Sequence, residues 1–144
     1  MATNYLDVAT EIALEAGKIL REEFDRPPDI AYKGEADLVT QADKRSEKCI
    51  VERLTKYFPD HGIVAEEGSG HGGSSEFRWY VDPLDGTTNF AHSYPCFCVS
   101  IALEHRDQLI AGVVYNPIYN ELFTAARGEG AKLNVLGSIA FPEI

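Results

Sequence analysis

Two aspartates three positions apart, Asp82 and Asp85, have the spacing and the surroundings of metal ligands. They follow an apolar run at residues 79–81 and belong to the sequence DPLDGTTNF, which occupies residues 82–90. Hard oxygen ligands of this kind suit Mg²⁺, which proteins usually hold through one or two carboxylates together with water and substrate phosphate. Gly86 permits a tight backbone path, and the threonines after it can begin a helix whose free N–H groups attract phosphate. The segment therefore predicts a magnesium site beside an anion site.

Two other interpretations of the aspartate pair explain less. Aspartates at these positions could cap a turn and a helix, which this residue does well, but capping does not account for the whole nine-residue string. The haloacid-dehalogenase phosphatase motif also places two carboxylates and Gly-Thr after an apolar strand, with one residue between its aspartates. Two residues separate Asp82 from Asp85, so their carboxylates would not face one pocket as that mechanism requires. We therefore exclude this motif.

Three segments of the chain, taken together, resemble the inositol monophosphatase family of Mg²⁺-dependent, lithium-sensitive phosphatases. The string at residues 82–90 is similar to the family signature, and its Thr-Thr-Asn-Phe part is most similar to the monophosphatase branch. Residues 64–68, VAEEG, resemble the acidic metal-ligand segment. Lys33, together with residues 37–43, DLVTQAD, resembles the lysine-and-aspartate segment. Because the three motifs occur in the family's order, we expect the chain to belong to this family.

The resemblance implies a set of metal ligands. Asp82 would bridge two metal ions, Asp85 would bind the second ion and contribute to the phosphate site, and the Leu84 carbonyl would be a further ligand. Glu66 would bind metal and help to activate the attacking water. Glu67 would support the site from outside the coordination sphere. A backbone ligand at Leu84 explains how an apolar residue can lie inside a metal motif.

The resemblance also implies residues for phosphate binding and catalysis. Gly86 and Thr87 would donate backbone N–H groups to phosphate, and the Thr87 hydroxyl would help to orient the attacking water. Asp43 is expected near the metals. Residues 40–43 also have the spacing of a capping box at a helix start, and the two roles of the aspartate are compatible. Lys33 is expected close to the site on a mobile segment.

The implied function is a Mg²⁺-dependent phosphomonoesterase that hydrolyses inositol monophosphate or a related polyol or sugar phosphate by means of a metal-activated water. A net charge of −10 argues against nucleic acid and anionic membranes as partners, because both are polyanions. No apolar run approaches the ~18 residues of a membrane span, and an odd number of cysteines without metal-like spacing fits a reducing compartment. We expect a small phosphorylated polyol as substrate, a cytoplasmic location and, for full-length members, a homodimer.

The pattern of apolar residues predicts the elements that must position these groups. Apolar spacing predicts helices over residues 4–25 and 40–58. A short strand at residues 62–65 would end at Glu66, before a Gly/Ser-rich mobile loop at residues 68–75. Strands separated by turns, as in an antiparallel meander, are predicted at residues 98–104, 109–115 and 121–125. We therefore predict an α+β fold with two N-terminal helices packed on a mainly antiparallel sheet. It resembles the N-terminal part of the layered αβαβα sugar-phosphatase fold.

The resemblance extends over residues 1–134 and corresponds to the N-terminal half of a full-length enzyme. Family members carry a second signature, a Trp-Asp pair whose aspartate also binds metal. The single tryptophan of this chain, Trp79, is followed by Tyr80. Residues 135–144 have no counterpart in the family and look like a tail produced by truncation or frameshift. The alternative function is therefore a truncated, catalytically inactive fragment that only binds metal or a partner.

Overall fold

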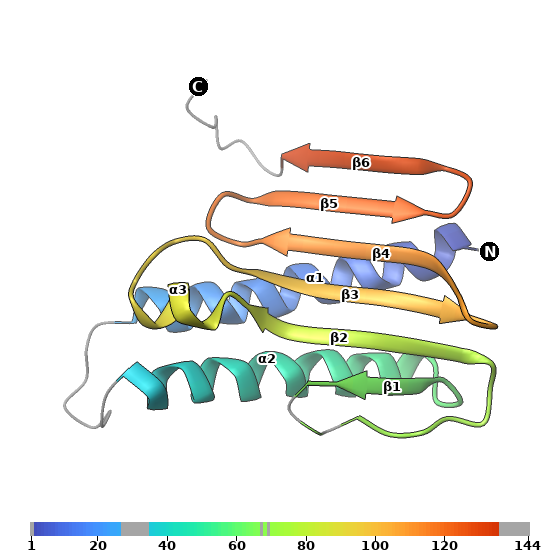
Figure 1. Ribbon diagram of the computed structural model, residues 1–144, viewed down its shortest axis with the longest axis horizontal. Coiled ribbons are helices and arrows are strands. Elements are labelled where there is room, and N and C mark those ends of the chain that lie inside the picture. The colour runs from blue at the N-terminus through green and yellow to red at the C-terminus, as the bar shows by residue number, and fades with distance from the viewer. Residues whose placement is uncertain (1, 27–34, 67, 69, 136–144) are drawn as a thin grey trace.

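The structure is a computed structural model that describes residues 2–26, 35–66, 68 and 70–135 (Figure 1). Two helices come first, and strands make up most of the rest of the chain. The elements in order are α1 (Ala2–Asp25), α2 (Glu35–Tyr57), β1 (Gly62–Ala65), β2 (Phe77–Asp85), α3 (Thr87–Ala91), β3 (Cys98–His105), β4 (Gln108–Asn116), β5 (Glu121–Ala126) and β6 (Gly130–Val135).

The six strands form one sheet in the order in which they occur along the chain. β1 runs parallel to β2, and every later pair is antiparallel. The connection between β3 and β4 consists of Arg106 and Asp107, with φ values of 50° and 64°. Two consecutive left-handed residues form the kind of tight turn whose twist matches that of the flanking strands. Short connections of this kind explain why the C-terminal part of the chain is a meander.

Both long helices pack on the same face of the sheet (Figure 1). α1 contacts β3, β4 and β5, whereas α2 contacts β1, β2 and α3. The buried residues of α1 recur at helical spacing and line one side of the helix: Ala9, Ile12, Ala13, Ala16 and Leu20. They meet the inward side chains of the strands, among them Trp79, Ile101, Leu103 and Val113. The core therefore lies between the sheet and the two helices.

The opposite side of the sheet, which we call the open face, carries no helix within the described residues. Alternation along the strands places exposed side chains there. Val64 pairs with Tyr80, Val114 with Phe123, and Phe123 with Leu133. All five side chains are exposed.

No helix of the described part of the chain is long and apolar enough to cross a membrane.

The predicted α+β architecture is confirmed, with three differences in its elements. α2 begins at Glu35 rather than Thr40, so the capping-box interpretation of residues 40–43 is wrong. Residues 40–43 lie inside the helix, because the five residues before them, EADLV, are already helical. Two of the six strands, β2 and β6, are not among the four predicted strands, and the sequence pattern marks residues 79–81 of β2 only as an apolar run. Val135, the first residue of the predicted tail, pairs with Glu121, and residues 136–144 lie outside the described residues.

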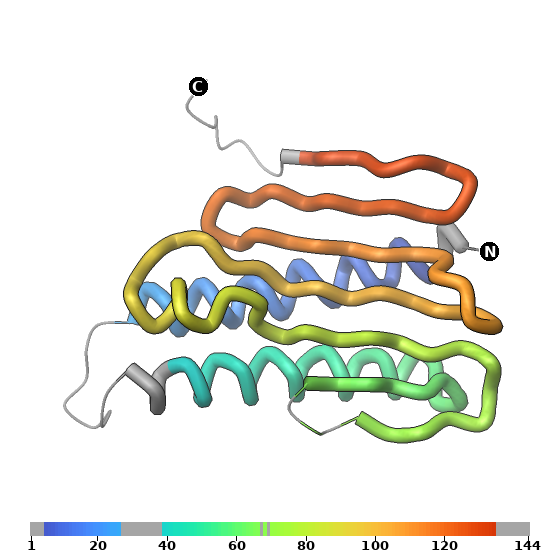
Figure 2. Tube along the Cα trace, viewed as in Figure 1, coloured from blue at the N-terminus to red at the C-terminus, as the bar shows by residue number. Residues whose placement is uncertain are grey.

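The segment predicted as a mobile loop makes more contacts than that prediction allows. Its residues from 70 onward turn back along the outer edge of β1 (Figure 2). The Ile63 N–H donates to the His71 carbonyl oxygen at 2.7 Å. The edge of β1 that faces away from β2 is therefore covered by the chain that follows it.

Candidate metal and phosphate site

Glu66 and Asp82 lie beside each other because of the way β1 pairs with β2. The last paired residues of this parallel ladder are Ala65 and Val81, and the residue that follows each of them in the chain carries a carboxylate. Paired residues point to the same side of a sheet, and successive residues point to opposite sides. Val81 is buried under the helices. The two carboxylates therefore share the open face.

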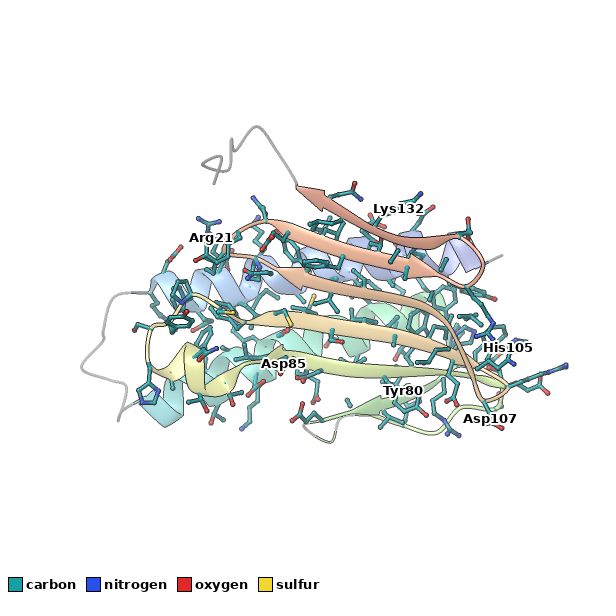
Figure 3. All side chains as sticks on the ribbon, turned by 45° about the horizontal axis from the view of Figure 1, so that its top comes forward. Arg21, Tyr80, Asp85, His105, Asp107 and Lys132 are labelled. Atoms are coloured by element: carbon teal, nitrogen blue, oxygen red, sulfur yellow. The ribbon has the colours of Figure 1, made fainter. Side chains whose placement is uncertain are left out.

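A shallow depression of about 270 Å³ lies over this carboxylate pair. Figure 3 shows two side chains of β2 in this region, with Tyr80 along the strand and Asp85 at its end beside α3. The volume of the depression lies at the lower end of the ~300–1,000 Å³ typical of small-molecule pockets, and it is open to solvent. Its lining consists of Val64, Ala65, Glu66, Tyr80, Val81, Asp82, Ser100 and Ala102.

The environment of Asp82 raises the pKa of its carboxyl from 3.8 to about 7. Partial burial is the largest cause, followed by a hydrogen bond with Glu66 and by the negative charges of Glu66 and Asp85. The Leu84 N–H, which donates to Asp82 Oδ1 at 3.3 Å, acts in the opposite direction. Carboxylates that crowd a half-buried space cannot all ionise easily. A bound cation would remove that repulsion.

A bulge in β2 separates the two aspartates of the motif. Between Asp82 and Asp85 the strand departs from regular pairing with β3, and Pro83 suits such a position because it has no N–H to donate. The Pro83 carbonyl accepts a hydrogen bond from the Ser46 hydroxyl of α2 at 2.7 Å. The Leu84 side chain is 2% exposed and anchors the bulge in the core. The apolar residues of the motif therefore fix the path of the backbone that carries the carboxylates.

The turn from β2 into α3 depends on Gly86. Its φ of 99° lies in the left-handed region, and a Cβ at this position would lie 3.0 Å from the Cys96 carbonyl oxygen. Both backbone conformation and space therefore favour glycine. Thr87, exposed, is the first residue of α3, and Phe90 anchors this five-residue helix in the core. The assignment of Gly86 and Thr87 to phosphate binding stays a prediction.

The remaining predicted site residues are less closely connected to the carboxylate pair. Asp43 is 7% exposed in the third turn of α2, three residues before Ser46, and it lies in the helix layer. Because α2 begins at Glu35, Asp43 is not at a helix N-terminus, and that part of its predicted role is wrong. Lys33 and Glu67 lie outside the described residues.

The described residues offer a donor set that suits Mg²⁺. They contain no group of three or more His, Cys, Asp or Glu side chains already gathered to hold a metal ion. Glu66 and Asp82 are nevertheless hydrogen bonded, and Asp85 is near enough to raise the pKa of Asp82. Mg²⁺ is usually held by one or two carboxylates, with waters and substrate phosphate completing its octahedron. Two adjacent carboxylates and a third nearby fit this requirement.

Two polar residues of this region were not among the predicted site residues. Ser46 holds the β2 bulge, and Asn89 donates its side-chain N–H to the Cys96 carbonyl oxygen at 2.9 Å, which closes the connection between α3 and β3. Asn89 belongs to the signature string at residues 82–90, and this position could have marked it as a site residue. A weaker indication existed for Ser46, which lies one helical turn after Asp43.

The sequence model of the inositol monophosphatase family matches residues 1–139 of the chain. Inositol monophosphatase 3 of Solanum lycopersicum is 48% identical over 134 residues, which cover 90% of this chain and 50% of that protein. Nus factor SuhB of Pasteurella multocida is 47% identical over 132 residues, which cover 90% of this chain and 49% of that protein. The chain belongs to the inositol monophosphatase family.

Solved structures agree with this membership. Extragenic suppressor protein suhB from Bartonella henselae superposes with a TM-score of 0.82 at 44% identity, covering 91% of this chain and 51% of that one. Inositol monophosphatase from Anabaena superposes with a TM-score of 0.79 at 44% identity, covering 92% of this chain and 47% of that one. The chain therefore spans about half the length of the relatives that it matches.

Proposed function

We propose that this chain carries the metal- and phosphate-binding half of a Mg²⁺-dependent phosphomonoesterase. The observation that carries the proposal is the register of β1 and β2, which brings Glu66 beside Asp82 and leads directly into Asp85 and the turn at Gly86. Carboxylates for a cation and the start of a helix for an anion are thus adjacent on one strand end. The names of the relatives support a phosphatase.

In the proposed reaction each residue of this half has a separate task. Bound Mg²⁺ would lower the pKa of a water molecule and neutralise charge on the transferring phosphoryl group. Glu66, Asp82, Asp85 and the Leu84 carbonyl would hold the cation, and Glu66 would also accept a proton from the attacking water. The Thr87 hydroxyl would orient that water while the Gly86–Thr87 backbone binds phosphate.

We further propose Asp43 and Lys33 as supporting residues of this site, for different reasons. The Asp43 carboxylate is buried in α2 close to Ser46, which contacts the motif directly. Lys33 is proposed from the family resemblance alone. A lysine ammonium near the site would offset part of its negative charge.

The proposed substrate is inositol monophosphate or a related polyol or sugar phosphate, and lithium is the expected inhibitor. We propose a cytoplasmic location because the three cysteines, Cys49, Cys96 and Cys98, are free thiols, as in a reducing compartment. The acidic charge of −10 supports a small substrate rather than nucleic acid or membrane. A homodimer is proposed for full-length relatives.

A second candidate function is a fragment that binds metal or a partner without turnover. Two observations favour it: the chain spans half the length of its relatives, and the depression over its carboxylate pair is shallow and open. One relative bears the name of a Nus factor rather than that of an enzyme, so members of the family are named for more than one role.

Turnover assays on two proteins separate these candidates. The chain itself and the same chain extended by the second half of a relative are assayed with inositol monophosphate, Mg²⁺ and, as inhibitor, Li⁺. We expect little or no hydrolysis by the chain and lithium-sensitive hydrolysis by the extended protein. Robust lithium-sensitive hydrolysis by the chain alone would rule out the inactive fragment. An extended, folded protein that binds Mg²⁺ without turnover would rule out the phosphatase.

Within the extended protein, Glu66→Gln tests the assigned metal ligand and Glu67→Gln is its matched control. We expect turnover to fall by about 10²-fold or more in the first variant, on the scale of lost acid–base catalysis, and much less in the second. Equal losses, or losses in the reverse order, would show that the assignment is wrong by one residue.

A further inference from the structure

The segment after β1 forms a cover along that strand, which we call the glycine strap (residues 70–75). Its first contact with the strand is an isolated antiparallel bridge between His71 and Ile63, in which the Ile63 N–H donates to the His71 carbonyl oxygen at 2.7 Å. At the other end of the strap, the Ser75 N–H donates to the carbonyl oxygen of Asp60, which precedes β1, at 3.1 Å. The strap thus contacts the chain on both sides of β1's first residue, Gly62.

Two glycines of the strap are required by close approach of its backbone to β1. A Cβ at Gly70 would lie 2.4 Å from the Ile63 carbonyl oxygen, and a Cβ at Gly73 would lie 2.3 Å from the Gly62 nitrogen. Both neighbours are backbone atoms and cannot move aside without moving the strand. Gly72 differs, because a Cβ there has no atom within 4 Å. The strap therefore has room for a side chain at Gly72 but not at Gly70 or Gly73, as expected for a backbone packed directly against the strand.

A side chain also ties the strap to the helix layer. His71 Nε2 lies 3.2 Å from the Thr55 hydroxyl oxygen of α2, and His71 Nδ1 lies 3.3 Å from the Gly72 carbonyl oxygen. A neutral ring with its proton on Nδ1 satisfies both contacts, since Nδ1–H donates to the carbonyl and Nε2 accepts from the hydroxyl. The strap is thus held from two directions, by β1 and by α2.

β1 needs such support because of its size and its pairing. It has four residues and pairs with one strand, β2, in a parallel ladder, which is slightly less stable per residue than an antiparallel one. Glu66 is the residue that follows, and its place beside Asp82 depends on the register Ala65–Val81. A slip of one residue would send every side chain of β1 to the other face of the sheet.

We infer that the glycine strap is a positioning segment for the metal site, which holds β1 in register so that Glu66 stays beside Asp82. The metal role in this inference rests on the proposed function; the geometric role does not. Because groups that orient metal ligands typically change metal affinity by about 10- to 100-fold when they are removed, loosening the strap is expected to weaken Mg²⁺ binding on that scale.

The test compares Gly73→Ala and Gly70→Ala with Gly72→Ala, which adds the same methyl group in open space. Calorimetry measures Mg²⁺ affinity, and NMR of the metal-free protein follows the Ile63 amide exchange rate and the carboxyl resonances of Glu66 and Asp82. We expect the first two variants to bind Mg²⁺ at least ten times more weakly, to exchange the Ile63 amide faster and to shift both carboxyl resonances. Resonances of β4 and β5 should stay in place. Gly72→Ala should match the wild type in all three measurements.

A milder variant keeps the inference testable if either alanine substitution prevents folding. Thr55→Val preserves side-chain shape and removes the hydroxyl that His71 contacts, and we expect smaller changes in the same direction. Unchanged carboxyl resonances and Ile63 exchange in every folded strap variant would overturn the inference, whatever happens to Mg²⁺. Wild-type chain that binds no Mg²⁺ would instead count against the proposed function, while the NMR comparison still decides whether the strap positions Glu66.

Discussion

At the scale of single residues, Asp82 combines a perturbed carboxyl group with a proposed role in metal binding. Its carboxyl is crowded by Glu66 and Asp85, and its pKa of about 7 lies far above the 3.8 of a free aspartate. Because the folded chain prefers the protonated acid, the stability that this group contributes is fully present below about pH 4. It is lost as the pH rises through about 7. A cation at this position would have to displace the proton.

Mg²⁺ binding to the chain should therefore depend on pH and release a proton. Below about pH 7 affinity should fall about tenfold per pH unit, because the proton competes for Asp82, and it should level off above that value. Calorimetry in buffers of different ionisation enthalpy counts the proton. Asp82→Asn should weaken binding strongly and abolish this pH dependence. Binding that is equally tight at pH 6 and pH 8 in the wild type, or unchanged in the variant, would contradict the assigned site.

At the scale of elements, the aromatic column at the start of β2 is a second place where ionisation is linked to folding. The His61 ring is stacked between Phe58 and Phe77, with centroid distances of 4.7 Å on each side. Its Nδ1 accepts the Trp79 indole N–H at 2.9 Å, which requires a neutral ring. Burial lowers the pKa of His61, and the charge of Asp60 opposes this only partly. The column joins the end of α2 to β2.

This geometry predicts that protonation of His61 destabilises the chain in mild acid, with a sign opposite to that of the Asp82 contribution. A histidine pKa that is lower in the folded state means that the unfolded chain binds more protons. The stability is therefore present above pH 6.5 and lost as the pH falls from there toward the folded-state pKa. His61→Phe keeps the stack and should remove this loss between pH 7.5 and pH 5.5 in urea unfolding. At pH 7.5 it should also cost about 1–3 kcal/mol, because the Trp79 N–H loses its acceptor.

The matched control for this prediction is His105→Phe, at the other end of the same column. The His105 ring stacks on Phe77 at 4.1 Å, and its side chain is 33% exposed. Its Nε2 lies 3.6 Å from Glu76 Oε2 at the surface, and His61 rather than His105 accepts the Trp79 indole N–H. We expect this variant to keep the wild-type difference in stability between pH 7.5 and pH 5.5. If His61→Phe shows the same difference in stability between the two pH values as the wild type does, the buried ring is not the cause.

The extent to which the sequence predicts the fold and the site differs between elements. The apolar periodicity of α1 and the turn residues between β3, β4 and β5 are local signals, and the predicted elements there match the structure. The start of α2 was misplaced by five residues because the polar spacing at residues 40–43 imitates a helix cap. β1–β2 pairing and the strap could not be predicted, since they depend on contacts between backbones rather than on the pattern of side chains. Two glycines that look like flexible loop residues are in fact close-contact positions.

At the scale of the whole molecule, the proposed metal ligands and an apolar surface share the open face. One cross-strand row runs from Asp82 through Ser100 and Val114 to Phe123 and Leu133. The last three side chains are 37%, 43% and 52% exposed. A contiguous apolar surface of this kind usually marks an interface. In relatives of twice this length, additional chain is available to cover such a face.

The chain as it stands should therefore associate through its open face, despite its charge of −10. Replacing Phe123 and Leu133, which pair across β5 and β6, by lysine puts two charges into the apolar row without touching the core. We expect this double variant to sediment as a monomer at concentrations where the wild type forms larger species. Tyr94→Lys is the control, because Tyr94 is 60% exposed and lies outside the sheet, and it should associate like the wild type. If association persists in the double variant, the open face is not responsible. The outer edge of β6, which has no partner strand within the described residues, would then be the contact, because unpaired strand edges also join chains together.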